Sequence, residues 1–108
     1  MEFFTLLRSA IYGLHYWLRY SLGGIMKDTK DWDKYWLDEA KKLLLHKRIV
    51  NVRYLTQQEA DDMGWYERSV AFQTQDGLWF FPSRDDEGNG GGALFTSDEK
   101  QGCLPVMR

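Results

Sequence analysis

A glycine-rich acidic segment, residues 84–95, constrains the fold more than any other part of this sequence. Three consecutive acids are followed by five positions of which four are glycine, and Ala93-Leu94-Phe95 ends the segment. Glycine in the interior of a helix or a strand costs about 0.5–1 kcal/mol relative to alanine. The segment is therefore predicted to be a loop, either a tight structural crossing or a binding loop, whose apolar end packs back against a sheet.

The side chains of this loop are candidates for contact with a partner or a cation. Neighbouring carboxylates repel one another when buried, so at least two of the three acids are predicted to be exposed or paired, with Arg84 as the nearest cation. The alternating oxygen-bearing side chains resemble the start of a calcium loop, but position twelve holds Thr96 instead of a bidentate glutamate. A turn in which Asp and Asn bond their own backbone is the favoured interpretation. The candidate contact loop consists of Arg84, Asp85, Asp86, Glu87 and Asn89, of which Asp85, Glu87 and Asn89 are the candidate metal residues.

Few residues of this chain suit catalysis or metal binding. Its 108 residues are the length of one domain. The single cysteine, Cys103, excludes an intrachain disulfide, and with His15 and His46 it gives no zinc-ligand spacing. No histidine follows His46, so a nucleophile in the C-terminal half has no histidine base in that half. The sequence predicts no catalytic residue, no metal and no cofactor, and it favours a protein that is not an enzyme.

Charge is divided unevenly along the chain. Residues 1–48 carry nine Lys and Arg residues against six Asp and Glu residues, whereas residues 49–108 carry five against ten. The favoured interpretation is that these charges lie on solvated faces, and the alternative is that the two halves attract each other within one fold. No basic stripe that suits phosphates is present, which argues against nucleic acid as a partner.

Residues 3–22 are predicted to form an amphipathic helix with a wide apolar face, which Gly23 and Gly24 end. Two arginines within the span argue against a transmembrane helix, because each costs about 2.5–3.5 kcal/mol at the bilayer centre. Three roles stay open for this helix: packing on its own domain, docking on a partner subunit, or lying on a membrane surface. The predicted partner or membrane contacts are Phe3, Phe4, Leu7, Ile11, Leu14, Trp17 and Leu18.

A second helix is predicted over residues 30–47, because acids lie in its first turn and bases at its end, which complements the helix dipole. Its predicted buried stripe consists of Trp32, Trp36, Ala40, Leu43 and Leu44.

Beyond this helix the apolar period changes to two. Alternation predicts strands over residues 50–54 and 70–74, and a capping box from Thr56 to Glu59 opens a short helix between them. Asp76-Gly77 predicts a turn into residues 78–81, which are apolar on both faces and are therefore expected to form a central strand. A last strand is predicted over residues 104–107.

The predicted fold class is α+β, with two N-terminal helices followed by a small, mostly antiparallel sheet of three to four strands. Residues 1–25 are predicted to be an appendage that carries the amphipathic helix. Residues 26–108 are predicted to form a small α+β domain.

The order of motifs in residues 49–107 resembles that of a group of small bacterial proteins with no established activity. The shared order is a strand that ends in a threonine-capped helix, a Gly-Trp turn, an Asp-Gly hairpin, an acid-Gly-Asn loop and a Leu-Pro strand. The resemblance supports the fold and implies no function. The matching segments are Val52-Arg53-Tyr54-Leu55-Thr56, Glu59-Ala60, Met63-Gly64-Trp65, Asp76-Gly77, Phe81-Pro82-Ser83, Asp85-Asp86-Glu87-Gly88-Asn89, Gly92-Ala93-Leu94-Phe95 and Leu104-Pro105-Val106.

These observations favour a non-enzymatic interaction or accessory protein that docks on a larger complex through the helix at residues 3–22, or that self-associates. The first alternative is a cytoplasmic protein held at a membrane surface by the same helix. The second is a small cation-binding protein or enzyme that uses the acidic loop at residues 85–89. The expected location is the cytoplasm.

Overall fold

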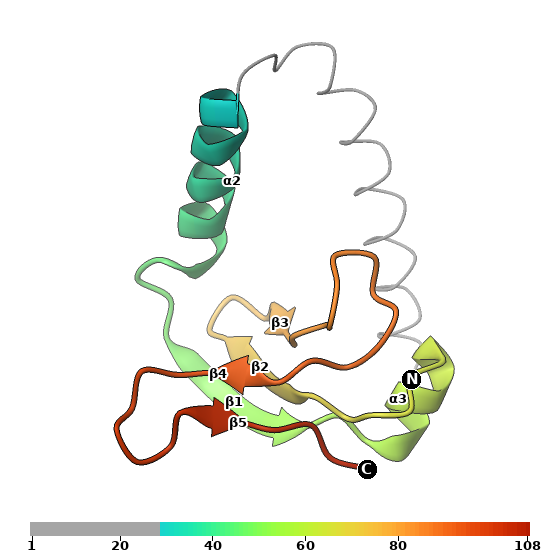
Figure 1. The fold of residues 1–108 in the computed structure, drawn as a ribbon. Helices are drawn as coiled ribbons and strands as arrows, with labels where there is room; N and C mark the ends of the chain where they lie inside the picture. The colour runs from blue at the N-terminus through green and yellow to red at the C-terminus, as the bar shows by residue number, and fades with distance from the viewer. Residues whose placement is uncertain (1–28) are drawn as a thin grey trace. The chain divides into compact units, whose positions relative to one another are not determined.

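The computed structural model describes residues 29–108, which fall into two compact units, residues 29–47 and residues 48–108 (Figure 1). The described residues confirm a mixed helix and sheet fold, with two helices and small antiparallel sheets. The helix predicted over residues 3–22, with all of its contact residues, lies outside the described residues, and so does the predicted boundary between residues 25 and 26.

The first unit contains helix α2, Thr29–Leu44. Asp31 lies in its first turn, and Lys41 and Lys42 lie in its last turn, which complements the helix dipole as the sequence predicts. The helix ends at Leu44 rather than at the predicted residue 47. The physical reason is His46, whose backbone adopts a left-handed conformation with φ of 63° that cannot continue a right-handed helix.

Most of the predicted buried stripe of α2 is exposed, which corrects that prediction, and only Trp32 of the stripe is half-buried. Trp36 keeps 43% of its surface exposed, and Leu37, Leu43 and Leu44 are also exposed. A seven-residue spacing places Trp36 with Leu43, and Leu37 with Leu44, on one side of the helix. The amphipathic pattern thus located the apolar face, but a pattern in the helix cannot show what covers that face.

The second unit is built around a three-stranded antiparallel sheet. Its strands are β1 (Ile49–Tyr54), β2 (Val70–Thr74) and β3 (Trp79–Phe80), in the order β1-β2-β3. The strands predicted over residues 50–54 and 70–74 are therefore confirmed. Gly77, with φ of 90°, makes the predicted turn between β2 and β3.

The strand predicted to be central, residues 78–81, is instead the edge strand β3. Its two apolar faces have separate partners. Trp79 and Phe81 pack against the buried core, whereas Phe80 stacks on Phe72 with ring centroids 5.2 Å apart. A strand that is apolar on both faces must be packed against on both faces, but it does not need a hydrogen-bonded neighbour at both edges. For this reason the apolar composition of residues 78–81 wrongly indicated a central strand.

Helix α3, Gln57–Met63, lies between β1 and β2 in the sequence, as predicted. The predicted capping box is present, since the Thr56 side chain accepts from the Glu59 N–H and the Glu59 side chain accepts from the Thr56 N–H. Gly64 ends the helix in the left-handed conformation, with φ of 74°.

The core of this unit lies where α3 and the turn after it meet the sheet. Trp65 contacts Phe81 edge to face, with ring centroids 5.9 Å apart. Because these buried side chains come from α3, from β2 and from the segments next to them, folding of the sheet and of α3 is coupled. The buried residues of this core cluster are Leu55, Ala60, Met63, Trp65 and Ala71, and Val70 of β2 is also buried.

A second, two-stranded antiparallel sheet follows the glycine loop. Its strands are β4 (Leu94–Phe95) and β5 (Cys103–Leu104). The fold therefore has one sheet of three strands and one of two strands, instead of the single sheet predicted. The predicted strand over residues 104–107 is shorter because Pro105 has no N–H to donate, although its carbonyl accepts from the Tyr54 hydroxyl at 2.9 Å.

Candidate functional site

The glycines of the acidic loop allow the main chain of residues 90–92 to lie very close to residues 82–84. Arg84 N–H donates to Gly90 O at 2.9 Å, and Gly92 N–H donates to Pro82 O at 3.0 Å. A Cβ atom on Gly92 would lie 2.8 Å from the Ser83 carbonyl, which is closer than carbon atoms pack. The sequence predicted a tight structural crossing or a binding loop, and this geometry is that of a tight crossing.

Two side chains from the turn after α3 hold this loop on the core. Trp65 Nε1 donates to Gly88 O at 2.8 Å. The fully buried Ser69 hydroxyl donates to Pro82 O at 2.8 Å and accepts from Gly92 N–H at 3.0 Å. The loop is therefore fixed by hydrogen bonds to buried groups at its two ends and near its tip.

Asp85 organises the tip of the loop. Its carboxylate accepts from the Glu87 N–H at 3.0 Å, from the Asn89 N–H at 3.1 Å and from Asn89 Nδ2 at 3.0 Å. The Asn89 side-chain and backbone hydrogen bonds, followed by the Glu87 N–H and the charge of Arg84, lower the pKa of Asp85 below its usual value. The Asp85 oxygens thus serve the turn in which Asp and Asn bond the local backbone.

The acids of the loop point into solvent, and the apolar end of the loop is only partly buried. Arg84, Asp85, Asp86 and Glu87 are exposed. Ala93 and Leu94 are half-buried, as expected for an end that packs back on the sheet. Phe95 is 78% exposed, so the prediction is wrong for this residue. It lies on β4, where alternation turns its side chain away from that of Leu94.

A partly buried ion pair that the sequence did not predict links β1 and α3 and contacts β3. Arg53 donates from Nη1 and Nη2 to the two carboxylate oxygens of Glu59, at 2.7 and 2.9 Å. The Arg53 guanidinium also lies over the Trp79 ring, 4.8 Å from its centroid. The capping box identified Glu59 at the helix start, but its pairing with Arg53 depends on how β1 enters α3.

The protonation state of this pair is fixed by its hydrogen bonds. Burial alone raises the pKa of Glu59, but the hydrogen bonds from Arg53 and Thr56, together with the charge of Arg53, outweigh burial and lower the pKa. The hydrogen bond to Glu59 raises the pKa of Arg53 against the opposing effect of burial. A carboxylate held ionised by a guanidinium on a structural helix cap is a stabilising group, not a proton donor.

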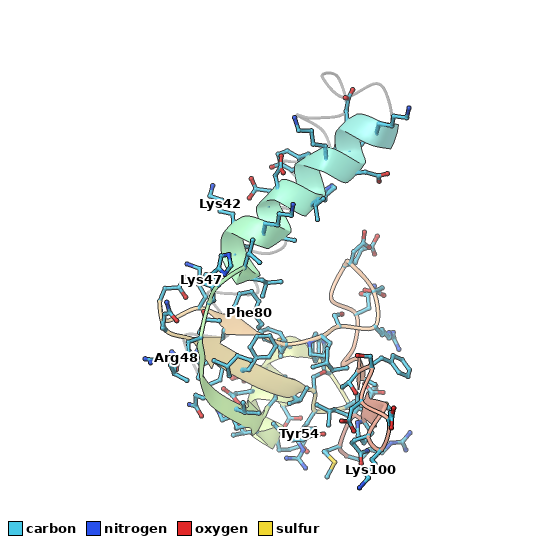
Figure 2. The ribbon with its side chains drawn as sticks, turned by 90° about the vertical axis from the view of Figure 1, so that its left-hand side faces the viewer. Lys42, Lys47, Arg48, Tyr54, Phe80 and Lys100 are labelled. Atoms are coloured by element: carbon cyan, nitrogen blue, oxygen red, sulfur yellow. The ribbon has the colours of Figure 1, made fainter. Side chains whose placement is uncertain are left out.

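The three-stranded sheet carries exposed apolar residues on the face opposite the core. Val52 is 62% exposed, and Val50 and Leu78 are also exposed. Figure 2 labels Arg48, just before β1, Tyr54 at the end of β1, and Phe80 on β3 of the same sheet. This face and the apolar side of α2 are the main apolar surfaces among residues 29–108.

Within residues 29–108, no group of three or more His, Cys, Asp or Glu residues is placed to hold a metal ion. Asp85 and Asn89 lie together, yet their contacts are with each other and with the loop backbone. No described helix combines the length and the apolar character that crossing a membrane requires.

No protein-family model, curated protein or solved structure matches this chain. The resemblance of residues 49–107 to a group of small bacterial proteins therefore stays a prediction. Any function must be argued from the residues and contacts described above.

Proposed function

We propose that this protein is a non-enzymatic interaction or accessory protein, which docks on a larger protein complex through the apolar helix predicted at residues 3–22. The observation that supports an interaction role is the exposed apolar side of α2, the described helix that follows residues 3–22 in the sequence. Trp36, Leu37, Leu43 and Leu44 all lie on this helix and are all exposed. A helix with such a side needs a partner surface, because its stability comes mainly from packing of that side.

The composition of this side is that of a contact surface. Aromatic residues are enriched among the residues that contribute most to binding at protein interfaces. Tyr35 meets Trp36 edge to face, with ring centroids 5.0 Å apart, which restricts the indole before any partner binds. Restriction of an anchor residue in advance reduces the entropy lost on association.

The acidic loop supplies a polar rim rather than an anchor in this proposal. Its four consecutive charged residues, Arg84 to Glu87, are exposed and carry a net negative charge. Charges at an interface rim act mainly on the association rate and on the choice of partner. Basic groups on the partner are therefore expected to face this loop.

The polar residues that the sequence offered for chemistry have structural partners. Glu59 pairs with Arg53, Asp85 caps its own loop, and Ser69 joins the two ends of that loop. These contacts support a role in binding rather than in catalysis, since a catalytic acid or nucleophile must face the substrate.

The proposal is tested by capture of partners with the full chain. The triple variant Leu7→Asp, Ile11→Asp and Leu14→Asp should lose a protein that the wild-type chain retains, because three charges disrupt the apolar face. The control is Thr5→Asp, Tyr12→Asp and His15→Asp, which adds the same charge on the other predicted face and should retain that protein. Equal capture by the two variants, or none by the wild type, would contradict the proposal.

Liposome flotation separates docking on a protein from attachment to a membrane. Vesicles with and without anionic lipid are mixed with the purified full chain alone. Docking on a protein predicts that the chain stays at the bottom of the gradient. Flotation that the Leu7, Ile11 and Leu14 variant abolishes would replace the proposal with the membrane alternative.

A further inference from the structure

The outer edge of β1 presents main-chain groups that no other described strand pairs. In the sheet order β1-β2-β3, β1 has β2 on one side only. Leu55 N–H donates to Ser69 O at 2.9 Å, which shows that the main chain of Leu55 faces the β2 side. Main-chain groups alternate along an antiparallel strand, so those of Arg53 also face β2 and those of Val52 and Tyr54 face outward.

This edge lacks most of the features that usually prevent strands from pairing. Proline and lysine are absent from Ile49–Tyr54, and Val52 is 62% exposed. The one charged side chain of the strand, Arg53, is directed to Glu59 and Trp79 rather than to the edge. A register shift between Ile49 and Asn51 disturbs only the start of the strand, so that residues 51–54 stay regular.

We propose that β1 pairs antiparallel with β1 of a second copy of this chain, with Val52 opposite Val52 on a two-fold axis. Pairing along the outer edge requires that outward-facing residues exchange hydrogen bonds, so Val52 meets either Val52 or Tyr54. The second register places Arg53 opposite Arg53, which like charges disfavour. The first register places Asn51 opposite Arg53, so that no two like charges face each other.

The charges that flank β1 favour a second copy over another partner. Arg48 precedes the strand and is exposed (Figure 2). Helix α3, which follows the strand, carries Asp61 and Asp62 and no base, while its third acid, Glu59, is already paired with Arg53. Antiparallel self-pairing brings the basic start of one strand beside the acidic helix of the other copy, and the two-fold axis repeats this attraction. Two three-stranded sheets then form one continuous sheet.

This interface is separate from the helical docking surface proposed above, so each can fail alone. The first test is a cross-link in the full chain with Cys103→Ser as background. Val52→Cys should give a disulfide-linked dimer under mild oxidation, because Cα atoms of an antiparallel hydrogen-bonded pair are about 5.5 Å apart and within disulfide reach. The control is Tyr66→Cys, whose parent residue is 89% exposed on a turn and should cross-link only at background level.

The second test is the mass in solution by light scattering over a range of concentration. The wild-type mass should rise from 12.8 kDa toward twice that value. Val52→Lys should hold the mass at the monomer value, because it places two ammonium groups on the axis, and it should keep the wild-type circular dichroism because Val52 is exposed.

Three results would overturn self-pairing. One is a wild-type chain that is monomeric at every concentration. Another is a Val52→Cys variant that links no more than the Tyr66→Cys control. The third is a dimer that Val52→Lys leaves intact, which would place the interface elsewhere. If the wild-type chain is monomeric and Val52→Lys abolishes capture of another protein, the edge of β1 pairs with a strand of that protein and not with a second copy.

Discussion

The two described units differ in whether they bury any large apolar residues, since residues 48–108 have a buried core and residues 29–47 have none. Residues 48–108 bury Leu55, Met63 and Trp65 and keep most of their polar contacts internal. The unit of residues 29–47 keeps Trp36 and Leu43 exposed on a single helix. The difference indicates that the sheet unit holds its own fold, whereas α2 gains little stability from its apolar side until a surface covers it.

The comparison also separates the roles of two tryptophans, one in each unit. Trp65 is buried and joins the core to the glycine loop through its indole N–H. Trp36 is exposed and has Tyr35 as its ring neighbour. One residue type therefore serves stability in one unit and is available for contact in the other.

The largest expected effect is the loss of Trp65. Trp65→Ala should lower the free energy of unfolding of the sheet unit by about 3–5 kcal/mol, because it leaves a large cavity and removes the hydrogen bond to Gly88 O. Trp36→Ala should change it by no more than about 0.5 kcal/mol. Urea denaturation followed by far-ultraviolet circular dichroism measures both values. Similar losses from the two substitutions would show that α2 is part of the same core.

The ion pair of β1 with α3 should give the next largest effect. Glu59→Gln should lower the free energy of unfolding at pH 7 by about 2–4 kcal/mol, less than for a fully buried pair, because Arg53 is 35% exposed and water solvates part of its charge. The matched control is Glu99→Gln, which makes the same change on an exposed side chain. If Glu59→Gln lowers the free energy of unfolding no more than the control does, the Arg53–Glu59 pair does not stabilise the fold.

The same pair predicts how stability depends on pH. The pKa of Glu59 is lowered in the folded state from its ordinary value of 4.5, so the unfolded chain binds the proton first as the pH falls. The stabilisation is therefore complete above the unfolded pKa and is lost as the pH decreases through the folded pKa. Asp85 contributes in the same direction because its pKa is also lowered. Glu59→Gln should flatten the acid limb of stability against pH, and an unchanged slope would contradict this assignment.

A smaller effect is expected from crowding the glycine loop. Gly92→Ala should cost about 1–3 kcal/mol, because its Cβ would lie 2.8 Å from the Ser83 main chain, which cannot rotate away. Gly102→Ala is the control, since its Cβ would have the Thr96 carbonyl as its nearest atom, at 4.0 Å. Thermal unfolding of the two variants gives the comparison. Equal stability would mean that the loop shifts freely, and the crossing would then be less rigid than its hydrogen bonds indicate.

Local rules predicted the elements of the sheet unit well. The alternation at β1 and β2, the Thr56 to Glu59 capping box and the Asp76-Gly77 turn each depend on neighbours in sequence. Strand order was not predictable in this way, because an apolar run such as residues 78–81 carries no information on which edge is paired. Neither was the pairing of β4 with β5, since two-residue strands have almost no pattern.

In the candidate site, too, features set by neighbouring residues were predictable and features set by the folded geometry were not. Sequence identified the acidic glycine loop and the Asx-type turn as one interpretation of it, because Asp85, Glu87 and Asn89 are close in the chain. The Arg53–Glu59 pair and the anchoring of the loop by Trp65 and Ser69 join residues that are distant in sequence or that need the folded geometry. The exposure of α2 depends on what surface it meets, and this information is not in the helix itself.

The smallest expected effect lies at the tip of the acidic loop. Here the structural group is the carboxylate of Asp85, and the exposed group to compare with it is the neighbouring carboxylate of Asp86. Asp85 accepts three hydrogen bonds from its own loop, so Asp85→Ala should speed hydrogen exchange of the Asn89 amide and slightly lower the melting temperature. Asp86→Ala should change that amide less, since the Asn89 N–H donates to Asp85. Calcium titration of the wild type should show no site tighter than about millimolar, because a strong calcium loop needs six or more oxygen ligands and Asp85 is already committed to N–H donors. Micromolar calcium binding that Asp85→Ala abolishes would show instead that the carboxylate exchanges these donors for a cation.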